Sequence, residues 1–447
     1  PPAPGRSRSR IDCELVSRTG HSISCEPPCT FVLPHDVVFE DGLSEEEAIA
    51  TALANNSTFQ ATLTQLGMAE GDYVQAGLLT NPNFSTFLPL SAKQWEWKLF
   101  VPIEAFILRP ERLAATGSQY ETVANQLVQN GLNLVRDVRV AHTELALAIA
   151  QRELAADAVG IRRGIAEISE KRLNRGDIGE LETITTRVDA LNAVALEGLL
   201  DQRIVVARSR LALLMGMPPE NYPFSAELTR PPAAAAPEVE TLIAQALANR
   251  PDAHAAQWSV DSAAHRAELA RRQFLRFDFV ADANAKGFKG FEAGPGVRFD
   301  IPIFNRNQGG VMRADAELAQ AMHLRGATHE QIVQEVRASA AEWKQALDQL
   351  AILESRVVPA LSEAQELAEK GYAAGGADYL LVLQTTSQYL DARTRLLDQL
   401  AALRRARAEL ERSLGATLPP GLEEIPLPEA EFPLPEIEAP FPDEEFE

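Results

Sequence analysis

The octapeptide IATALANN, residues Ile49–Asn56, returns almost unchanged as IAQALANR, residues Ile243–Arg250. The second copy lies about 200 residues after the first, so the two copies mark similar halves of the 447-residue chain. Both stand within stretches whose apolar residues recur with the spacing of an amphipathic helix. A helical segment repeated at this distance indicates that the fold is assembled from two related units.

Three further landmarks recur in the same order. Pro102 with Ile103 corresponds to Pro302 with Ile303, Gly176 corresponds to Gly375, and Gly216 corresponds to Gly415. Their common order indicates an internal duplication with a unit of about 200 residues. We therefore predict an N-terminal arm over residues 1–40, a first repeat over 41–236, a second repeat over 237–415 and an acidic, proline-rich tail over 416–447.

Each repeat contains the same predicted elements in the same order. An amphipathic helix over 45–79 or 239–275 comes first, two extended runs follow at about 82–106 or 277–304, and long helices complete the unit at about 107–216 or 305–415. No proline occurs between Glu111 and Met217, so a helix from Leu108 to Arg172 is expected to reach on the order of 100 Å. Helices of this length favour coiled-coil packing or a helical tube. Pro359 should kink or break the matching stretch of the second repeat.

The extended runs alternate apolar and polar residues, which is typical of strands with one apolar and one polar face. Trp95 and Trp97 stand near the end of one run, as in the aromatic belts of membrane–water interfaces. An ordinary sheet with one face on a core and the other in water is the alternative. We favour lipid, because the long helices are expected to pack on one another and leave no cover for the sheet. The predicted lipid-facing residues are Trp95, Trp97, Leu99, Val101, Phe299 and Ile301.

Four strands are too few to close a barrel, and open strand edges are not tolerated in lipid. Two, three or four copies of the chain would supply about eight, twelve or sixteen strands, and single-chain barrels begin at about eight. The predicted fold class is therefore mainly α with a small transmembrane β part that is completed by oligomerisation.

Composition and motifs exclude several classes of function. A formal net charge of −21 argues against a nucleic-acid-binding protein, which would carry a basic face. No run of 18 apolar residues occurs, so no transmembrane helix is predicted. The sequence lacks a G-x-S-x-G elbow, a glycine-rich phosphate loop and an H-E-x-x-H motif, so we predict no enzyme and no cofactor.

The two ends of the chain have distinct compositions. Residues 419–447 contain ten acidic residues and no basic one, and we expect this tail to be disordered and solvated. Cys13, Cys25 and Cys29 all lie near the N-terminus, with His21 among them. Cys-x₃-Cys with one histidine is an incomplete zinc pattern, so a Cys25–Cys29 disulfide or a mobile arm is favoured over a metal site.

The doubled layout and four motifs resemble the TolC-type outer-membrane efflux channels. The motifs are EEAIATALANN at 46–56, QAGLLTNPNFS at 75–85, PIFNRNQGG at 302–310, and Arg172-Leu173 with Gly176 at a helix turn. The resemblance extends from Asp41 to Gly415 and leaves out the arm and the tail. The residues of the PIFNRNQGG motif favour the heavy-metal branch of this family. The transported substrate stays open among metal ions, drugs, organic solvents and secreted protein.

This resemblance implies a homotrimer in the outer membrane of a Gram-negative bacterium. Twelve strands would form one β-barrel, and the helices would form an α-barrel across the periplasm. Such channels are passive exit ducts that dock through a periplasmic adaptor protein to an inner-membrane pump. A periplasmic coiled-coil scaffold, or an adaptor without a channel, is the alternative function. A scaffold leaves the four alternating runs without a purpose, and an adaptor would need small β-domains with a doubled lipoyl-like motif, which the sequence does not show.

The resemblance also assigns roles to the helix turns. Those at Leu173–Gly179 and Tyr372–Asp378 should form the periplasmic tip. Paired aspartates follow the second turn in the family prototype, where this sequence has Leu381 and Gln384. An acidic ring at the closed end of the tunnel should therefore come from the first repeat, against the simpler interpretation of solvated carboxylates. The ring candidates are Glu180, Glu182 and Asp189, and the adaptor-docking candidates are Arg172, Leu173, Gly176, Gly375 and Gly376.

Overall fold

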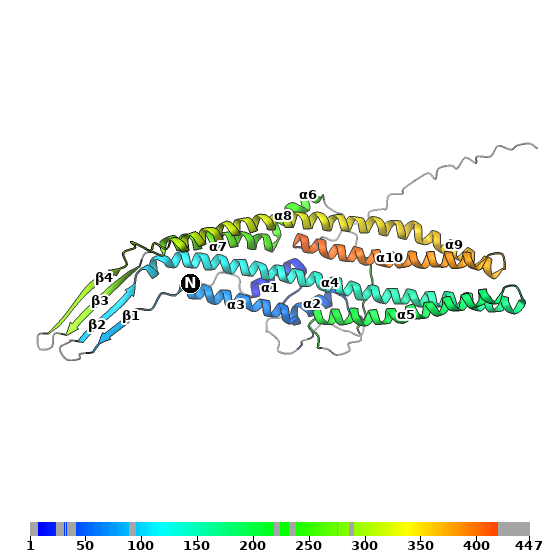
Figure 1. Cartoon of the computed structure of the whole chain (residues 1–447), viewed down its shortest axis with the longest axis horizontal. Helices are drawn as coiled ribbons and strands as arrows, with labels where there is room; N and C mark the ends of the chain where they lie inside the picture. Colours follow the sequence, from blue (N-terminus) through cyan, green and yellow to red (C-terminus); the bar gives the residue numbers. More distant parts are fainter. Residues whose placement is uncertain are drawn as a thin grey trace, which may run out of the picture.

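The computed structural model describes residues 8–23, 31, 33, 42–88, 95–218, 224–231, 238–274, 276–285 and 290–418. This part of the chain forms a long rod (Figure 1). Four strands make up one end, the tips of two helical hairpins make up the other, and shorter helices surround the middle. Cys25, Cys29, part of the inter-repeat linker and most of the acidic tail lie outside the described residues. Within the described ranges, no helix is both long and apolar enough to cross a bilayer.

The two repeats have the same order of elements. The first, preceded by α1 (Arg8–Thr19), consists of α2 (Glu45–Asn55), α3 (Ser57–Gly77), β1 (Asn83–Phe87), β2 (Trp95–Pro102), α4 (Glu104–Arg175) and α5 (Glu180–Leu214). The second consists of α6 (Val239–Asn249), α7 (Pro251–Arg272), β3 (Phe277–Ala285), β4 (Phe291–Phe299), α8 (Gln308–Ile352), the π-helical turn η2 (Leu353–Val357), α9 (Val358–Ala373) and α10 (Tyr379–Leu414).

The first predicted helix of each repeat is in fact two helices. The prediction of one helix over 45–79 was wrong, because Asn56 is extended and its side chain accepts a hydrogen bond from the Phe59 N–H, which starts α3. The prediction over 239–275 was wrong for a related reason. Arg250 is extended, and Pro251 occupies the first position of α7, where a helix needs no N–H.

The break between α2 and α3 allows a contact that closes the first repeat. The Asn56 side chain donates to the backbone carbonyl of Leu214, at 2.9 Å, in the last turn of α5. Gly216 follows with a left-handed φ of 68°, and a Cβ there would lie 2.3 Å from the carbonyl oxygen of Asn55. Only glycine allows the two helix ends to approach this closely.

The same contact closes the second repeat with a different side chain. Arg250, which replaces the last asparagine of the octapeptide, donates to the backbone carbonyl of Ser413 at 3.2 Å, and Gly415 has a φ of 72°. Arg250 is almost wholly buried, and its guanidinium also binds Asp252 at 3.0 Å and Glu335 at 2.7 Å. The repeated octapeptide is therefore one half of a helix-end junction that each repeat uses.

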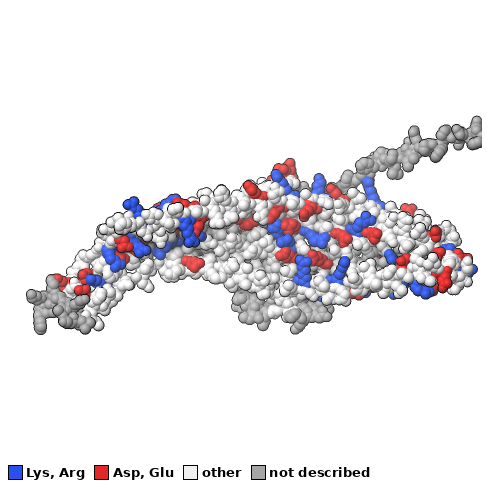
Figure 2. Space-filling model, in the orientation of Figure 1, with Lys and Arg blue, Asp and Glu red and all other residues white. Residues whose placement is uncertain are grey.

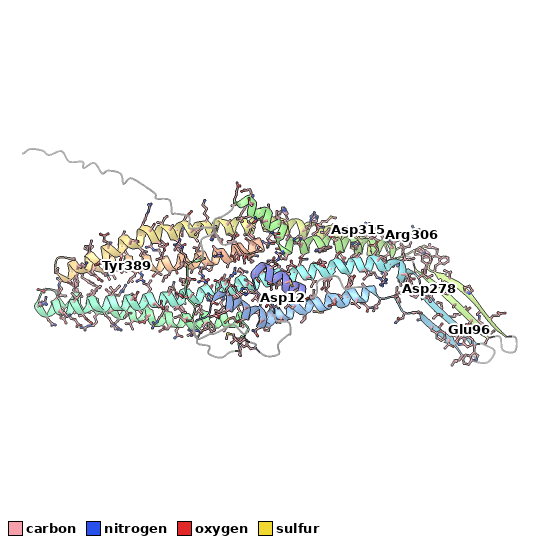
Figure 3. The ribbon with its side chains drawn as sticks, turned by 180° about the vertical axis from the view of Figure 1, so that it is seen from behind. Asp12, Glu96, Asp278, Arg306, Asp315 and Tyr389 are labelled. Carbon is pink, nitrogen blue, oxygen red and sulfur yellow. The ribbon has the colours of Figure 1, made fainter. Side chains whose placement is uncertain are left out.

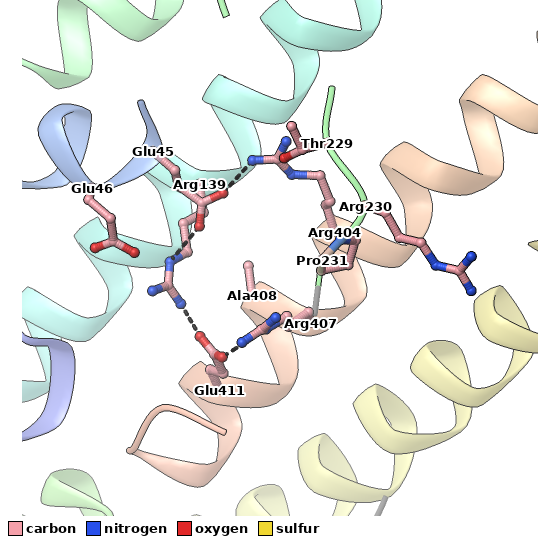
Figure 4. Close-up of a pocket in the computed structure, with 10 residues that line it drawn as sticks. All are labelled: Glu45, Glu46, Arg139, Thr229, Arg230, Pro231, Arg404, Arg407, Ala408 and Glu411. Carbon is pink, nitrogen blue, oxygen red and sulfur yellow. Dashed lines mark hydrogen bonds and ion pairs between the residues drawn. The ribbon is translucent and has the colours of Figure 1, made fainter. Parts of the chain in front are cut away.

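A chain of ion pairs joins the two repeats, with Arg404 and Arg407 at its two ends (Figure 4). Glu45 of α2 binds Arg139 of α4 at 3.0 Å and Arg404 of α10 at 2.5 Å. Glu411 of α10 binds Arg139 and also Arg407, the latter at 3.1 Å. These side chains border a cavity of about 270 Å³. Removing one partner would leave a partly buried charge without its counter-charge. The chain of ion pairs therefore fixes the two repeats against each other.

The N-terminal arm contains a helix that the sequence analysis did not predict. Leu15 of α1 is fully buried in the core of the first repeat. Gly131 of α4 makes room for it, since a Cβ at Gly131 would lie 2.7 Å from the Leu15 side chain. Arg18 donates to the backbone carbonyls of Asn249, at 2.8 Å, and Gly415, at 2.9 Å. Helix α1 therefore connects the core of the first repeat with the junction of the second.

The long helical columns of the two repeats differ in continuity. Helix α4 runs through 72 residues, as its proline-poor sequence predicted. In the second repeat, Pro359 does not break the column. The chain forms the π turn η2 just before it, and the Val358 N–H bonds to the carbonyl of Leu353, five residues back. The expected break is therefore a widened turn, which accommodates a proline that has no N–H to offer.

Alanine substitutions at Gly176, Gly415 and Gly216 test the helix-end junction. The three φ angles lie between 68° and 78°, so each alanine should cost about 1–3 kcal/mol of stability through backbone strain. A Cβ at Gly176 meets no described atom within 4 Å, one at Gly415 meets the Arg250 side chain at 3.3 Å, and one at Gly216 meets backbone at 2.3 Å. We expect the fall in melting temperature, followed by circular dichroism, to increase in that order. Equal falls at Gly176 and Gly216 would contradict the junction.

Candidate functional site

The four strands form one antiparallel sheet in the order β1-β2-β3-β4. Phe84 pairs with Leu99, Leu99 with Ala281 and Ala281 with Pro295, so an apolar row crosses all four strands. Successive side chains alternate between faces, and Thr86 is the one polar residue that the described strands place on this face. The sheet projects beyond the helices, and none of the described helices covers it (Figure 1).

The apolar face is widely exposed within one copy of the chain. Phe84 is 63% exposed and Val297 is 65% exposed. Trp97 groups with Trp95 and Phe291, its ring centroid lying 5.9 Å and 6.0 Å from theirs. An apolar patch of this extent marks a surface that contacts lipid or another protein.

The residues predicted to face lipid lie on this face with one exception. Trp95, Trp97, Leu99 and Val101 share it along β2, and Phe299 ends β4 on the same side. Ile301 lies two residues after Phe299, the last residue of β4, and is therefore outside the strand. The alternation of the sequence continues past the strand end, so the pattern alone could not locate that end.

The opposite face of the sheet is polar. The Arg298 Nε donates to Asp278 at 2.7 Å across β3 and β4, and Lys98 lies 3.6 Å from Glu96 on β2 (Figure 3). The Arg298 guanidinium also lies over the ring of Phe100, 4.4 Å from its centroid. A sheet with one charged and one apolar face suits a wall between water and lipid.

Both helix turns lie at the end of the rod opposite the sheet (Figure 1). Gly176 ends α4 with a φ of 78°, and the N–H groups of Gly176 and Asp177 bond back to Leu173 and Arg172. Gly375 has a φ of 81° in the turn between α9 and α10. No atom of the described chain lies within 4 Å of a Cβ at either glycine, so the outer surface of both turns is open.

Contacts between the two hairpins join their tips. The Arg172 guanidinium lies over the ring of Tyr372, 4.6 Å from its centroid, and donates to the Tyr372 carbonyl at 3.5 Å. Leu173 is half-buried beside it, whereas Gly376 is exposed and closes the second turn by donating to the Gly371 carbonyl at 2.9 Å. Arg172 is thus engaged within the protomer, while the glycines stay accessible.

Two of the three predicted ring carboxylates bind tyrosines of the second repeat. The Tyr372 hydroxyl donates to Glu182 at 3.0 Å, and the Tyr379 hydroxyl donates to Asp189. Glu180 is exposed on the first turn of α5. The sequence analysis selected the carboxylates and missed the tyrosines. The sequence offered one signal for the tyrosines. They stand on either side of the turn between α9 and α10, which corresponds in the second repeat to the turn that precedes the carboxylates.

Both tyrosines are permanent hydrogen-bond donors. Burial raises the pKa of Tyr372 and of Tyr379, and the carboxylates of Glu182 and Asp189 raise the two pKa values further because each would repel a phenolate. The tyrosines are 1% and 8% exposed, respectively. The two hydroxyl groups that donate the hydrogen bonds between the hairpins therefore stay protonated across the physiological pH range.

The tip carries little else that is reactive. Among the residues that the structure describes, no group of three or more His, Cys, Asp or Glu side chains is arranged to hold a metal ion. Leu381, at the position where the family prototype has an aspartate, is 49% exposed, and Leu380 beside it is 67% exposed.

Comparison with known sequences agrees with this geometry. Residues 242–416, most of the second repeat, match the family described as outer membrane efflux protein. The chain is 28% identical over 397 residues to the cobalt-zinc-cadmium resistance protein CzcC of Cupriavidus metallidurans, and the match covers 83% of this chain and 90% of that protein.

Solved structures share the fold. CusC matches with a TM-score of 0.70 and 19% identity over 88% of this chain and 98% of its own. The outer membrane protein VceC of Vibrio cholerae matches with a TM-score of 0.70 and 18% identity over 84% of this chain and 97% of its own. These findings confirm both the family resemblance drawn from the motifs and the mainly α fold with a small antiparallel sheet.

Tyr372→Phe and Tyr379→Phe should loosen the tip without disturbing the core, since each removes a hydroxyl and keeps the ring. A hydrogen bond to a charged group contributes about 1.5–3 kcal/mol. We expect spin labels at the exposed residues Leu181 and Leu380 to show a broader and longer distance distribution in either variant. Tyr389→Phe, in the middle of α10, is the control and should leave the distribution unchanged. The hydrogen bonds between the hairpins would be refuted if the two tip variants matched the parent.

Proposed function

We propose that three copies of this chain form the exit duct of a tripartite efflux system in the outer membrane, and that the duct conducts divalent metal ions. The observation that carries the proposal is the uncovered apolar face of the sheet. A periplasmic scaffold or an adaptor without a channel would have to keep that face in water at a large hydrophobic cost. Lipid removes the cost, and the polar face then lines an aqueous lumen.

The two free edges of the sheet support assembly. Strands β1 and β4 lie at opposite edges of the order β1-β2-β3-β4. Backbone groups left unpaired in lipid cost several kcal/mol each, so β4 of one copy should pair with β1 of the next. Three copies then close a barrel of about twelve strands. The homotrimer is the assembly that the family resemblance implies.

Helix α5 supports the same assembly along the rod. Its exposed apolar residues recur mainly at intervals of three, four, seven and eight, as in the seam of a coiled coil. A neighbouring copy would cover this seam and continue the helical wall into the periplasm. The exposed residues at these intervals are Leu181, Ile184, Val188, Leu191, Leu199 and Val206, and α5 also exposes Val194, Leu196, Val205 and Leu213.

The helical tip is the proposed entrance. The open turns around Gly176, Gly375 and Gly376 would meet the hairpin of a periplasmic adaptor, which links the duct to an inner-membrane pump. The carboxylates of Glu182 and Asp189, repeated around the threefold axis, would favour cations at the entrance. Solute passes without a catalytic step, because the pump supplies the energy.

The cargo proposal comes from CzcC, whose name specifies cobalt, zinc and cadmium. An acidic entrance suits such cations. In cells that carry the matching pump and adaptor, restoring this chain to a deletion strain should raise the tolerated concentrations of zinc, cobalt and cadmium. Gly176→Glu should form the channel yet fail to restore resistance, because it blocks docking. Restored resistance to apolar drugs but not to these metals would sink the cargo proposal.

Leu99→Arg and Lys98→Asp, on adjacent residues of β2, test which face meets lipid. A charge on the lipid face costs about 2–4 kcal/mol near the middle of the bilayer, so Leu99→Arg should reduce the yield of trimer. Lys98→Asp places its charge in the lumen and should assemble like the parent. Light scattering with correction for detergent measures both. Equal damage from the two changes, or a parent that is monomeric, would contradict the assembly.

A further inference from the structure

A turn after β4 exposes three apolar side chains and one cation. Ile301, Ile303 and Phe304 are 69%, 65% and 93% exposed, and Arg306 is exposed as well. The two isoleucines follow Phe299 after the end of β4, where the Ile303 N–H donates to the Ile301 carbonyl at 2.8 Å and the chain turns. We call Ile301, Ile303, Phe304 and Arg306 the junction collar. Figure 3 places Arg306 where the sheet meets the helices.

The backbone of this turn is held in an uncommon conformation. Asn307 has a φ of 63°, the one positive value that a non-glycine residue takes in the described chain. Its side chain donates to the carbonyl of Ala270 at 2.8 Å, and its N–H bonds to the Asn305 side chain at 2.9 Å. A Cβ at Gly310 would lie 2.3 Å from the Asn307 side-chain oxygen, so glycine is needed there. Backbone strain kept in place by its surroundings is common at functional sites.

These contacts explain the asparagines and the last glycine of PIFNRNQGG, but they do not explain Phe304 or Arg306. Phe304 is turned almost entirely to solvent. The Arg306 Nε donates to the Pro302 carbonyl at 3.2 Å, which orients the guanidinium while the residue stays exposed. The turn therefore presents an aromatic ring and a cation, two residues apart in the sequence, at the surface.

The depth of the collar follows from the length of the strands. Strands β3 and β4 have nine residues each, which corresponds to a rise of about 30 Å. The cluster of Trp95, Trp97 and Phe291 marks the hairpin end of the sheet, and the pair Phe277–Phe299, with centroids 6.4 Å apart, marks the helical end. Membrane barrels carry an apolar band of about 25 Å between two aromatic girdles. The collar thus falls at the second interface, where lipid phosphates lie.

We propose that the junction collar binds an anionic phospholipid of the leaflet on the helical side. Phe304 and the isoleucines enter the apolar edge of that leaflet, and the Arg306 guanidinium binds the headgroup phosphate, whose oxygens match its paired N–H groups. Lipid is the occupant because the collar follows directly after the pair Phe277–Phe299, at which the exposed apolar face of the sheet ends. This inference rests on the proposed outer-membrane function.

The test uses the full chain, reconstituted in vesicles of phosphatidylcholine with or without added phosphatidylglycerol. Native mass spectrometry of the released protein counts the phosphatidylglycerol that stays bound. Arg306→Gln should retain about fivefold less than the parent, the factor that corresponds to about 1 kcal/mol for one arginine at an anionic surface. Arg325→Gln, farther along α8 where Arg325 donates to Gln257 at 2.8 Å, should retain as much as the parent. Inorganic phosphate added to the vesicles that contain phosphatidylglycerol should not lower the amount of phosphatidylglycerol that stays bound.

Phe304→Ser supplies a second readout, because it should lower insertion into both kinds of vesicle whatever their charge. Unchanged retention in Arg306→Gln, equal loss in Arg325→Gln, or unchanged insertion of Phe304→Ser would overturn the inference. Loss of assembly by Arg306→Gln in lipid-free detergent would assign the collar to a second copy and overturn it too. A parent that neither inserts nor conducts would instead count against the proposed function, so the two failures can be told apart.

Discussion

The backbone groups along the outer edges of β1 and β4 have no partners among the described residues of one copy, and lipid supplies none. A sheet with one face that is apolar apart from Thr86 can therefore exist in a membrane only as part of a closed barrel. The rest of the molecule is consistent with that requirement. The polar face is the one that a closed ring would turn inward. The apolar seam of α5 runs along the rod beyond the sheet, so in the proposed trimer the contacts between copies would extend well past the membrane.

Duplication makes the rod possible, because each repeat contributes two strands and one long helical hairpin. Each repeat also closes on itself through the same contact, between the end of its first helix and its last turn. The side chain that bridges the junction differs between the repeats, since Arg250 stands where the first repeat has Asn56. The Arg250 side chain is longer than that of asparagine and positively charged, and it binds Asp252 and Glu335. Helices α7 and α8 therefore take part in the second junction. Together with the chain of ion pairs between α2, α4 and α10, this holds helices of both repeats together in the middle part of the rod.

Much of this architecture could be predicted from the sequence, since period and proline content report directly on long helices and two-faced strands. What escaped prediction depends on contacts between distant residues. Leu15 becomes a core residue only because Gly131 leaves space for it, and no local pattern of the arm reveals that. The hydroxyl of Tyr372 reaches Glu182 from 190 residues away. Asn56 is compatible with a continuing helix by local pattern, and the break occurs because its side chain can cap α3 and reach α5.

The two hairpins that form the tip are not mechanically equivalent. Helix α4 is one α-helix of 72 residues from the sheet to the first turn, whereas the matching column of the second repeat is interrupted at η2, Leu353–Val357. Helices bend where their hydrogen-bond ladder is irregular, so deformation of the tip should concentrate at η2. The inter-repeat linker reaches this point, since Arg230 binds Glu354 at 3.0 Å, but both side chains are about half exposed and such a pair restrains little. The second hairpin is held to the first along α10, where Asp398 accepts from Gln151 at 2.8 Å and Arg393 binds Asp157 at 3.2 Å, and at its far end by the bonds from Tyr372 and Tyr379. We expect any bending of the second column to begin at η2, because α4 has no matching π turn.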